Sequence, residues 1–142
     1  MAKVNPYLNF SGNCEEAFEF YRSVFGGEFS TLSRFSEMPA GAPSPEPDGN
    51  KIMHVSLPLG EGQVLMGSDR PGSMGPAVNG NAMSVSVSPT SSEEAATIFK
   101  GLSEGGEITM PLDKMFWGAE YGACSDRFGV QWMVNYDPNE PN

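Results

Sequence analysis

The stretch that decides the fold is residues 13–28, NCEEAFEFYRSVFGGE, because it returns as residues 91–107, SSEEAATIFKGLSEGGE. The shift is 78 residues at the start (13 to 91) and 79 near the end (27 to 106), so the second copy has gained one residue. Each copy follows a short run typical of a β-strand, Tyr7–Phe10 and Ser84–Val87. A repeat with a period near half the chain predicts two similar modules.

Each copy reads as an amphipathic helix with its own start and stop signals. Asn13 and Ser91 are the expected N-caps, and Glu16 and Glu94 stand at the third helical position, where they would complete capping boxes. A glycine pair follows each helix and is expected to end it. Apolar side chains at helical spacing are expected to face the core: Ala17, Phe20, Tyr21, Val24 and Phe25 in the first helix, and Ala95, Ile98, Phe99 and Leu102 in the second.

Strand-like runs follow each helix, so each half reads β-α-β-β-β. The runs are residues 28–35, 52–59 and 63–67 in the first half, and 107–110, 118–125 and 130–136 in the second. The predicted fold class is α+β, with two βαβββ modules forming a curved mixed sheet around a cavity. Each helix covers one face of its sheet, and curling the sheets together would bury the other faces in a concavity that suits small ligands.

The 142 residues are long enough for a single domain made of these two modules. We expect a first module at 1–70, a linker at 71–81, a second module at 82–137 and a tail at 138–142. Ser36–Asn50 contains four prolines and is too broken for a strand. It predicts a long loop, of the kind that acts as a lid or stays disordered.

The charge balance excludes several partners. Eighteen acidic residues against eight basic ones give a formal net charge of −10, so nucleic acid and anionic membranes are poor partners. No apolar stretch is long enough to span a membrane, and the first residues lack an apolar secretory segment, so we expect a cytoplasmic protein. Cys14 and Cys124 fit a reducing compartment and predict no disulfide framework.

Five motifs of the chain resemble those of a known family. The motifs that carry the resemblance are Tyr7–Ala17, Phe25–Glu28, Met66–Asp69, Phe116–Gly122 and Asp126–Asn135. They resemble the PhnB-like branch of the vicinal oxygen chelate superfamily, which includes glyoxalase I, bleomycin-resistance proteins and extradiol dioxygenases. The resemblance implies paired βαβββ modules, a homodimer, and, in the catalytic members, a divalent metal held by His and Glu from the first and last strands of each module.

The strands that would supply metal ligands offer none of the usual side chains. The first strands offer Tyr7, Asn9, Ser84 and Ser86, and the last strands offer Gln63, Met66, Gln131, Met133 and Asn135. Amides and hydroxyls are weak ligands for a catalytic transition metal, so we expect no metal site. Members of this branch often carry a quinone-methyltransferase label, but Gly60-x-Gly62 lies between two strands and does not fit a nucleotide-type loop. We therefore expect no cofactor.

His54 is the single histidine of the chain and the first candidate for acid–base chemistry. Strand alternation puts it on one face with Ile52 and Ser56, opposite Met53, Val55 and Leu57. The alternative is a structural histidine bonded to a neighbouring strand or to Tyr121.

A second cluster consists of Trp117, Glu120 and Tyr121, where an aromatic ring beside a carboxylate could stack a planar ligand and exchange a proton. Its alternative is that Phe116 and Trp117 are core or dimer-interface aromatics. Trp132 is expected in the core.

Two functions of different classes follow. The first is a small-molecule-binding protein that sequesters an apolar or aromatic ligand without a metal. Its expected contacts are Tyr7, Asn9, Ser56, Met66, Ser84, Trp117, Met133 and Asn135. The alternative is a lyase, isomerase or dioxygenase-type enzyme that uses His54 with Glu120 or Tyr121, or a non-standard metal site. A third possibility is a protein whose dimer surface is its main function.

Overall fold

The computed structural model of the protein describes residues 2–39, 41–44 and 46–140. Ala40 and Pro45 of the predicted long loop, Pro141 and Asn142 of the predicted tail, and Met1 lie outside the described residues. The chain divides into two compact units, unit 1 (Met1–Val78) and unit 2 (Asn79–Asn142), with the boundary inside the predicted linker.

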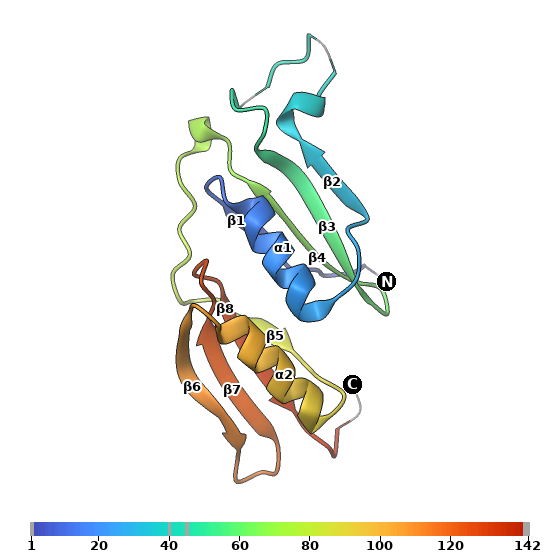
Figure 1. The fold of residues 1–142 in the computed structure, drawn as a ribbon, viewed down its shortest axis with the longest axis vertical. Helices are drawn as coiled ribbons and strands as arrows, with labels where there is room; N and C mark the ends of the chain where they lie inside the picture. The colour runs from blue at the N-terminus through green and yellow to red at the C-terminus, as the bar shows by residue number, and fades with distance from the viewer. Residues whose placement is uncertain (1, 40, 45, 141–142) are drawn as a thin grey trace. The chain divides into compact units, whose positions relative to one another are not determined.

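Both units have the element order β-α-β-β-β that the repeat predicts (Figure 1). Unit 1 contains β1 (Tyr7–Phe10), α1 (Cys14–Phe25), β2 (Thr31–Arg34), β3 (Ile52–Gly60) and β4 (Gln63–Asp69), with short 3-10 turns at Phe35–Glu37 and Gly72–Met74. Unit 2 contains β5 (Val85–Val87), α2 (Ser92–Ser103), β6 (Glu107–Lys114), β7 (Glu120–Ser125) and β8 (Gln131–Tyr136). The α+β class and the paired modules are confirmed.

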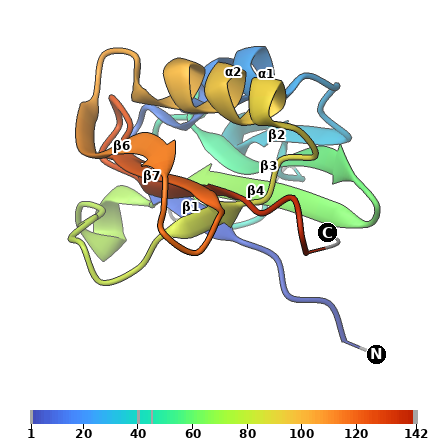
Figure 2. The same ribbon diagram turned by 90° about the horizontal axis from the view of Figure 1, so that it is seen from below.

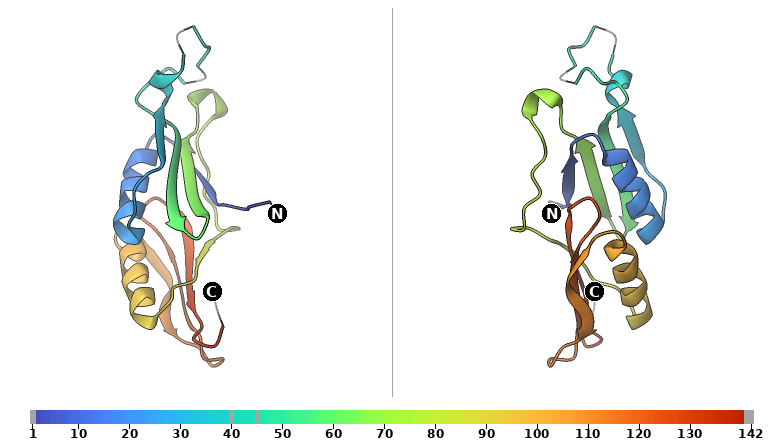
Figure 3. Two further views of the ribbon diagram at one scale, coloured as in Figure 1. Left: turned by 90° about the vertical axis from the view of Figure 1, so that its right-hand side faces the viewer. Right: turned by 60° about the vertical axis from the view of Figure 1, so that its left-hand side comes forward.

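The strands form two four-stranded mixed sheets, one in each unit. Unit 1 has the order β1-β4-β3-β2, and unit 2 has the order β5-β8-β7-β6. In each sheet the first strand runs parallel to the last strand of the same unit, and the other pairs are antiparallel. Figures 2 and 3 show that the helix of each unit lies against one face of its own sheet.

The core of unit 1 forms where α1 meets β3 and β4. Phe18 and Tyr21 are fully buried and pack edge to face, with ring centroids 5.4 Å apart. A Cβ on Gly67 would lie 2.6 Å from Cε1 of Phe18, so glycine at this position lets the helix approach the sheet. The predicted face of this helix is only partly confirmed. Ala17 and Tyr21 are buried, but Phe20, Val24 and Phe25 are only half-buried, and the buried Phe18 was not predicted.

The start of α1 is capped by a residue that is distant in the sequence. Asn13 makes no side-chain capping bond, so the capping box predicted there is wrong. Instead Asp69, at the end of β4, accepts backbone N–H groups of Gly12 (2.9 Å) and Cys14 (3.0 Å) on Oδ1. Its Oδ2 accepts the N–H of Ile52 at 2.9 Å, so one buried carboxylate joins the helix to two strands.

The start of α2 is capped locally, as the sequence predicts. The Ser91 hydroxyl accepts the N–H of Glu94 at 3.1 Å. Glu94 reaches back to the N–H of Thr90 (2.9 Å), one residue before the expected partner. Ala95, Ile98, Phe99 and Leu102 form the buried face of this helix, which confirms the predicted stripe.

A second buried carboxylate organises unit 2. Asp126 accepts the N–H groups of Phe128 (2.8 Å) and Val130 (3.0 Å) on Oδ1, and the indole Nε1–H of Trp132 (2.8 Å) on Oδ2. Trp132 is buried against this turn, so its expected core position is confirmed.

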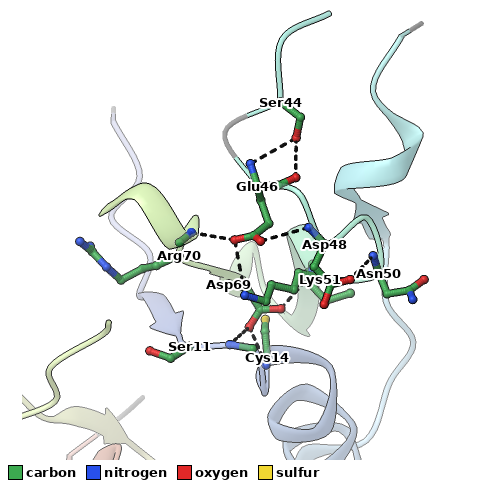
Figure 4. A network of polar contacts seen from close by, with 12 residues as sticks. Ser11, Cys14, Ser44, Glu46, Asp48, Asn50, Lys51, Asp69 and Arg70 are labelled. Atoms are coloured by element: carbon green, nitrogen blue, oxygen red, sulfur yellow. Dashed lines mark hydrogen bonds and ion pairs between the residues drawn. The ribbon is translucent and has the colours of Figure 1, made fainter. Parts of the chain in front are cut away.

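The predicted long loop is held to the end of unit 1 by Glu46, which is 4% exposed (Figure 4). Its carboxylate accepts the N–H groups of Asp48 (3.1 Å) and Gly72 (2.7 Å) and lies 3.4 Å from the Lys51 ammonium. These backbone N–H donors, assisted by Lys51, hold the pKa of Glu46 below its ordinary value. The described part of this loop is therefore anchored to residues that the sequence assigns to the linker.

Candidate functional site

One face of the unit 1 sheet is turned away from α1 and carries the predicted contacts of that unit, which are half of the full set. Tyr7, Met66 and Ser56 lie side by side in register on β1, β4 and β3. The alternate positions, which include Val55, Leu57, Leu65 and Gly67, are buried on the helix side. We call the outward set, which consists of Tyr7, Asn9, His54, Ser56, Met66 and Ser68, the open face of unit 1.

The sequence reasoning placed His54 and Ser56 on this face correctly, but not Ile52. A register shift between Ser33 and Arg34 on the partner strand interrupts the alternation beside Ile52. Ile52 is almost fully buried, and its backbone N–H bonds Asp69.

His54 is bonded at both ring nitrogens within the open face. Its Nδ1 lies 3.2 Å from Oη of Tyr7, and its Nε2 lies 2.9 Å from Oγ of Ser56. The Tyr7 and His54 rings are stacked, with centroids 5.7 Å apart and an interplanar angle of 25°. The Tyr7 side chain therefore extends from the edge strand β1 past β4 to reach β3.

The two hydroxyls that flank His54 differ in access to solvent. Ser56 is 8% exposed, whereas Tyr7 is 43% exposed. A hydroxyl can either donate or accept a hydrogen bond, so this arrangement is compatible with each protonation state of the imidazole. The two hydroxyls therefore hold the imidazole ring in place.

Unit 2 presents a comparable open face. Tyr121 lies opposite Asn135, and Met133 lies between Ala123 and Ser86 in register. Ser84 is exposed and comes just before β5. Tyr121, Met133 and Asn135 are half-buried and share this face, and the buried Gly122, Cys124, Trp132 and Val134 occupy the helix side.

The structure does not form the predicted cluster of Trp117, Glu120 and Tyr121. Neighbouring residues on a strand face opposite sides, and Glu120 lies on the helix side, where Ser92 of α2 donates to its carboxylate at 2.7 and 2.9 Å. Glu120 and Tyr121 therefore lie on opposite faces of β7 and do not share one site.

Trp117 lies in the turn between β6 and β7, next to Phe116. The two rings pack edge to face at 4.8 Å, and they are 53% and 98% exposed. A core role for this pair, one of the sequence alternatives, is therefore wrong, and a role in an interface stays a prediction.

Both cysteines are buried, unpaired thiols, one in each unit. Burial raises the pKa of Cys14 well above its ordinary range, and the nearby charges of Asp69 and Glu15 add to the shift. Burial, with the charge of Asp126, raises the pKa of Cys124 to about 11. Neither thiol is suited to act as a nucleophile at neutral pH.

The donor atoms of the open faces do not fit the metal site of the superfamily. Within residues 2–39, 41–44 and 46–140, no group of three or more His, Cys, Asp or Glu side chains is placed to hold a metal ion. The open faces offer hydroxyls, amides, thioethers and one imidazole, whereas catalytic zinc sites use imidazole and carboxylate together.

The sequence reasoning missed Ser68 of the open face and two further hydroxyls, on β2, that lie beside this face. Ser68 lies opposite Asn9 on β4, while Thr31 and Ser33 of β2 lie opposite Ser56 and His54. Alternation along β2 and β4 could have revealed these hydroxyls, since each stands two residues from another outward position.

The comparisons with known proteins agree with this architecture. A sequence model of the 3-demethylubiquinone-9 3-methyltransferase family matches residues 2–135. Protein PA1353 from Pseudomonas aeruginosa is 38% identical, with a TM-score of 0.84 over 96% of this chain and 98% of that one. The PhnB protein from Bacillus cereus, described with the same methyltransferase name, is 31% identical, with a TM-score of 0.73 over 95% and 99% of the two chains.

The fold extends to more distant proteins. A glyoxalase-related enzyme from Fulvimarina pelagi is 20% identical, with a TM-score of 0.63 over 99% of this chain and 92% of that one. Among the described residues, no helix is both long enough and apolar enough to cross a membrane.

Proposed function

Because the chain belongs to the 3-demethylubiquinone-9 3-methyltransferase family, the PhnB-like branch of the vicinal oxygen chelate superfamily, we propose that it binds a small planar apolar or aromatic molecule on the open face of unit 1. The observation that carries the proposal is the stacked Tyr7–His54 pair, fixed by hydrogen bonds beside Met66.

This face combines the features that a planar ligand needs. The partly exposed Tyr7 ring offers a stacking surface, and the thioether of Met66 offers a soft apolar contact that adapts to ligand shape. Asn9 and the hydroxyls of Tyr7 and Ser68 supply the few polar groups that orient a ligand in such a site. The open face of unit 2 repeats the combination with Tyr121, Met133 and Asn135 on a smaller scale.

The proposal involves neither a metal nor a nucleotide cofactor. The donor atoms of the open face do not match a zinc ligand set, as described above. Gly60, Glu61 and Gly62 all have positive φ (92°, 53° and 79°) and form the tight turn between β3 and β4. That turn joins two antiparallel strands, whereas a phosphate-binding glycine loop precedes a helix.

We test the proposal with two tyrosine variants, one in each unit. Binding of aromatic compounds is screened by thermal shift and quantified by calorimetry for the wild type, Tyr7→Ala and Tyr121→Ala. We expect Tyr7→Ala to lose the affinity and Tyr121→Ala to retain it. Full affinity in Tyr7→Ala would overturn the placement on unit 1. Saturable binding of a divalent metal, with no aromatic compound bound, would overturn the proposed function itself.

We also propose a homodimer, supported by the exposed apolar side chains of Phe116 and Trp117. Sedimentation velocity checks this part independently. We expect a dimer that Phe116→Ser weakens, and a monomer at all concentrations of the wild type would refute it.

A further inference from the structure

A continuous chain of side chains crosses the open face of unit 1, from a buried hydroxyl through an imidazole to an exposed hydroxyl. We propose that Tyr7 and His54, with the imidazole ring held by Ser56, form a proton relay that ionises the hydroxyl of a bound phenol or enol. This inference rests on the proposed function, because it names the chemical class of the ligand for the same face. The basis is the geometry: 2.9 Å from Ser56 Oγ to Nε2, and 3.2 Å from Nδ1 to Tyr7 Oη.

The chemistry of the two hydroxyls assigns a direction to the relay. A phenol donates a hydrogen bond better than an aliphatic alcohol and accepts one less well, because its lone pair is delocalised into the ring. Tyr7 therefore donates to Nδ1, and Nε2–H donates to Ser56. This tautomer leaves a basic nitrogen aimed at the exposed residue, and Ser56 acts as the positioning residue that holds the ring.

The ligand meets the relay at Tyr7, its exposed end. The Tyr7 and His54 rings are stacked at 25°, so a third planar ring that extends this stack brings its own hydroxyl near Oη of Tyr7. His54 makes no direct contact with the ligand. It receives the proton through Tyr7, so it is a positioning residue and Tyr7 is the residue that contacts the ligand.

The step balances without any further reactant. The ligand O–H bond breaks and its proton forms a new O–H bond on Tyr7, while the original Tyr7 proton moves to Nδ1 of His54. The products are a ligand oxyanion, a neutral Tyr7 and an imidazolium whose Nε2–H still donates to Ser56. The positive charge of the imidazolium stabilises the ligand oxyanion relative to the neutral hydroxyl, because the two charges are opposite and only a few ångströms apart.

The first test needs no ligand. His54 is the single histidine, so the ring nitrogens of ¹⁵N-histidine-labelled protein give two assignable signals. At neutral pH we expect Nε2 to be protonated and Nδ1 to be unprotonated, and Ser56→Ala should mix the two tautomers. A wild-type ring protonated only at Nδ1 would overturn the relay.

The second test uses 4-nitrophenol, whose phenolate has its own visible absorption, and 4-nitroanisole, which lacks the hydroxyl. At a pH where free 4-nitrophenol is mostly protonated, we expect the phenolate-to-phenol ratio of the bound compound to exceed that of the free compound by about tenfold, the lower end of the effect of one nearby charge. Tyr7→Phe should return the ratio to that of the free compound while 4-nitroanisole still binds, and Tyr121→Phe is the matched control.

The outcomes separate the two proposals. If both compounds bind to the wild type and the ratio does not rise, or if Tyr7→Phe raises it equally, the relay is wrong and the binding function stands. If neither compound binds, the proposed function fails for this ligand class, and the relay fails with it.

Discussion

Replacing Asp69 by asparagine tests whether one buried carboxylate holds unit 1 together. Asp69 accepts three backbone N–H groups, two at the start of α1 and one at the start of β3. Asparagine has nearly the same shape but only one accepting oxygen. If that oxygen continues to cap the helix, the new amide N–H₂ group faces the N–H of Ile52, and neither can accept from the other.

The magnitude follows from two losses. A buried backbone N–H left without an acceptor costs about 1–3 kcal/mol, and removing a negative charge from a helix N-terminus costs about 0.3–1 kcal/mol. Together these destabilise unit 1 by about 1.3–4 kcal/mol. At 1.4 kcal/mol per factor of ten, the population of the locally opened state rises by roughly 10-fold to 700-fold.

The buried cysteines provide a separate assay for each unit. Cys14 lies in the first turn of α1 and Cys124 lies in β7, and both are closed to a thiol reagent in the folded state. We measure reaction with an aromatic disulfide reagent, using Cys14→Ala and Cys124→Ala backgrounds to observe one thiol at a time. Asp69→Asn should accelerate Cys14 by the factor given above and leave Cys124 nearly unchanged. Asp126→Asn is the matched control, with the reverse pattern expected.

Two results would refute this reasoning. An unchanged Cys14 rate in Asp69→Asn would show that the third hydrogen bond is not needed for the stability of α1. Equal acceleration of both thiols would show that the two units open together, so that the effect of the cap is not local to unit 1.

Three further predictions concern other parts of the two units. Backbone N–H donors lower the folded-state pKa of Glu46, so its ionised carboxylate stabilises the folded state above the unfolded-state pKa, and this contribution is lost as the pH falls through the folded-state pKa. The difference in urea-unfolding free energy between the wild type and Glu46→Gln should therefore shrink between neutral pH and a pH below 4.5. Gly67→Ala should destabilise unit 1 by about 1–3 kcal/mol in the same urea assay, because the new Cβ overlaps the Phe18 ring; no change would mean that α1 can shift freely. Trp132→Phe removes the bond to Asp126 and should cost about 1.5–3 kcal/mol, the range for hydrogen bonds to charged groups, and a melting temperature equal to the wild type would contradict it.

Features written in contiguous residues were predictable from the sequence. The repeat gave the number and order of the elements because helical spacing, strand alternation and a glycine pair recur in each half. Ser91 could be identified as a cap because its partner Glu94 is three residues away. His54 and Ser56 could be placed on one face because strand alternation needs no knowledge of the neighbouring strands.

Features that depend on distant partners were not predictable. The α1 cap comes from Asp69, which is 55 residues from Cys14, so no local pattern reveals it. The contact of Tyr7 with His54 depends on the strand order β1-β4-β3, which composition and periodicity do not specify. Glu120 is a different case. Strand alternation alone puts the side chains of Glu120 and Tyr121 on opposite faces of β7, and the predicted cluster did not take this into account.

The difference between the two helix caps has a consequence for the order of folding. The serine cap of α2 is complete as soon as residues 90–94 are in place, so this helix can nucleate early and at small entropic cost. The start of α1 gains its acceptor only after β4 has returned to the helix, which closes a loop of more than fifty residues. We therefore expect the duplicated helix to form early in unit 2 and late in unit 1. Substitutions in α1 should mainly speed unfolding, whereas those in α2 should slow refolding.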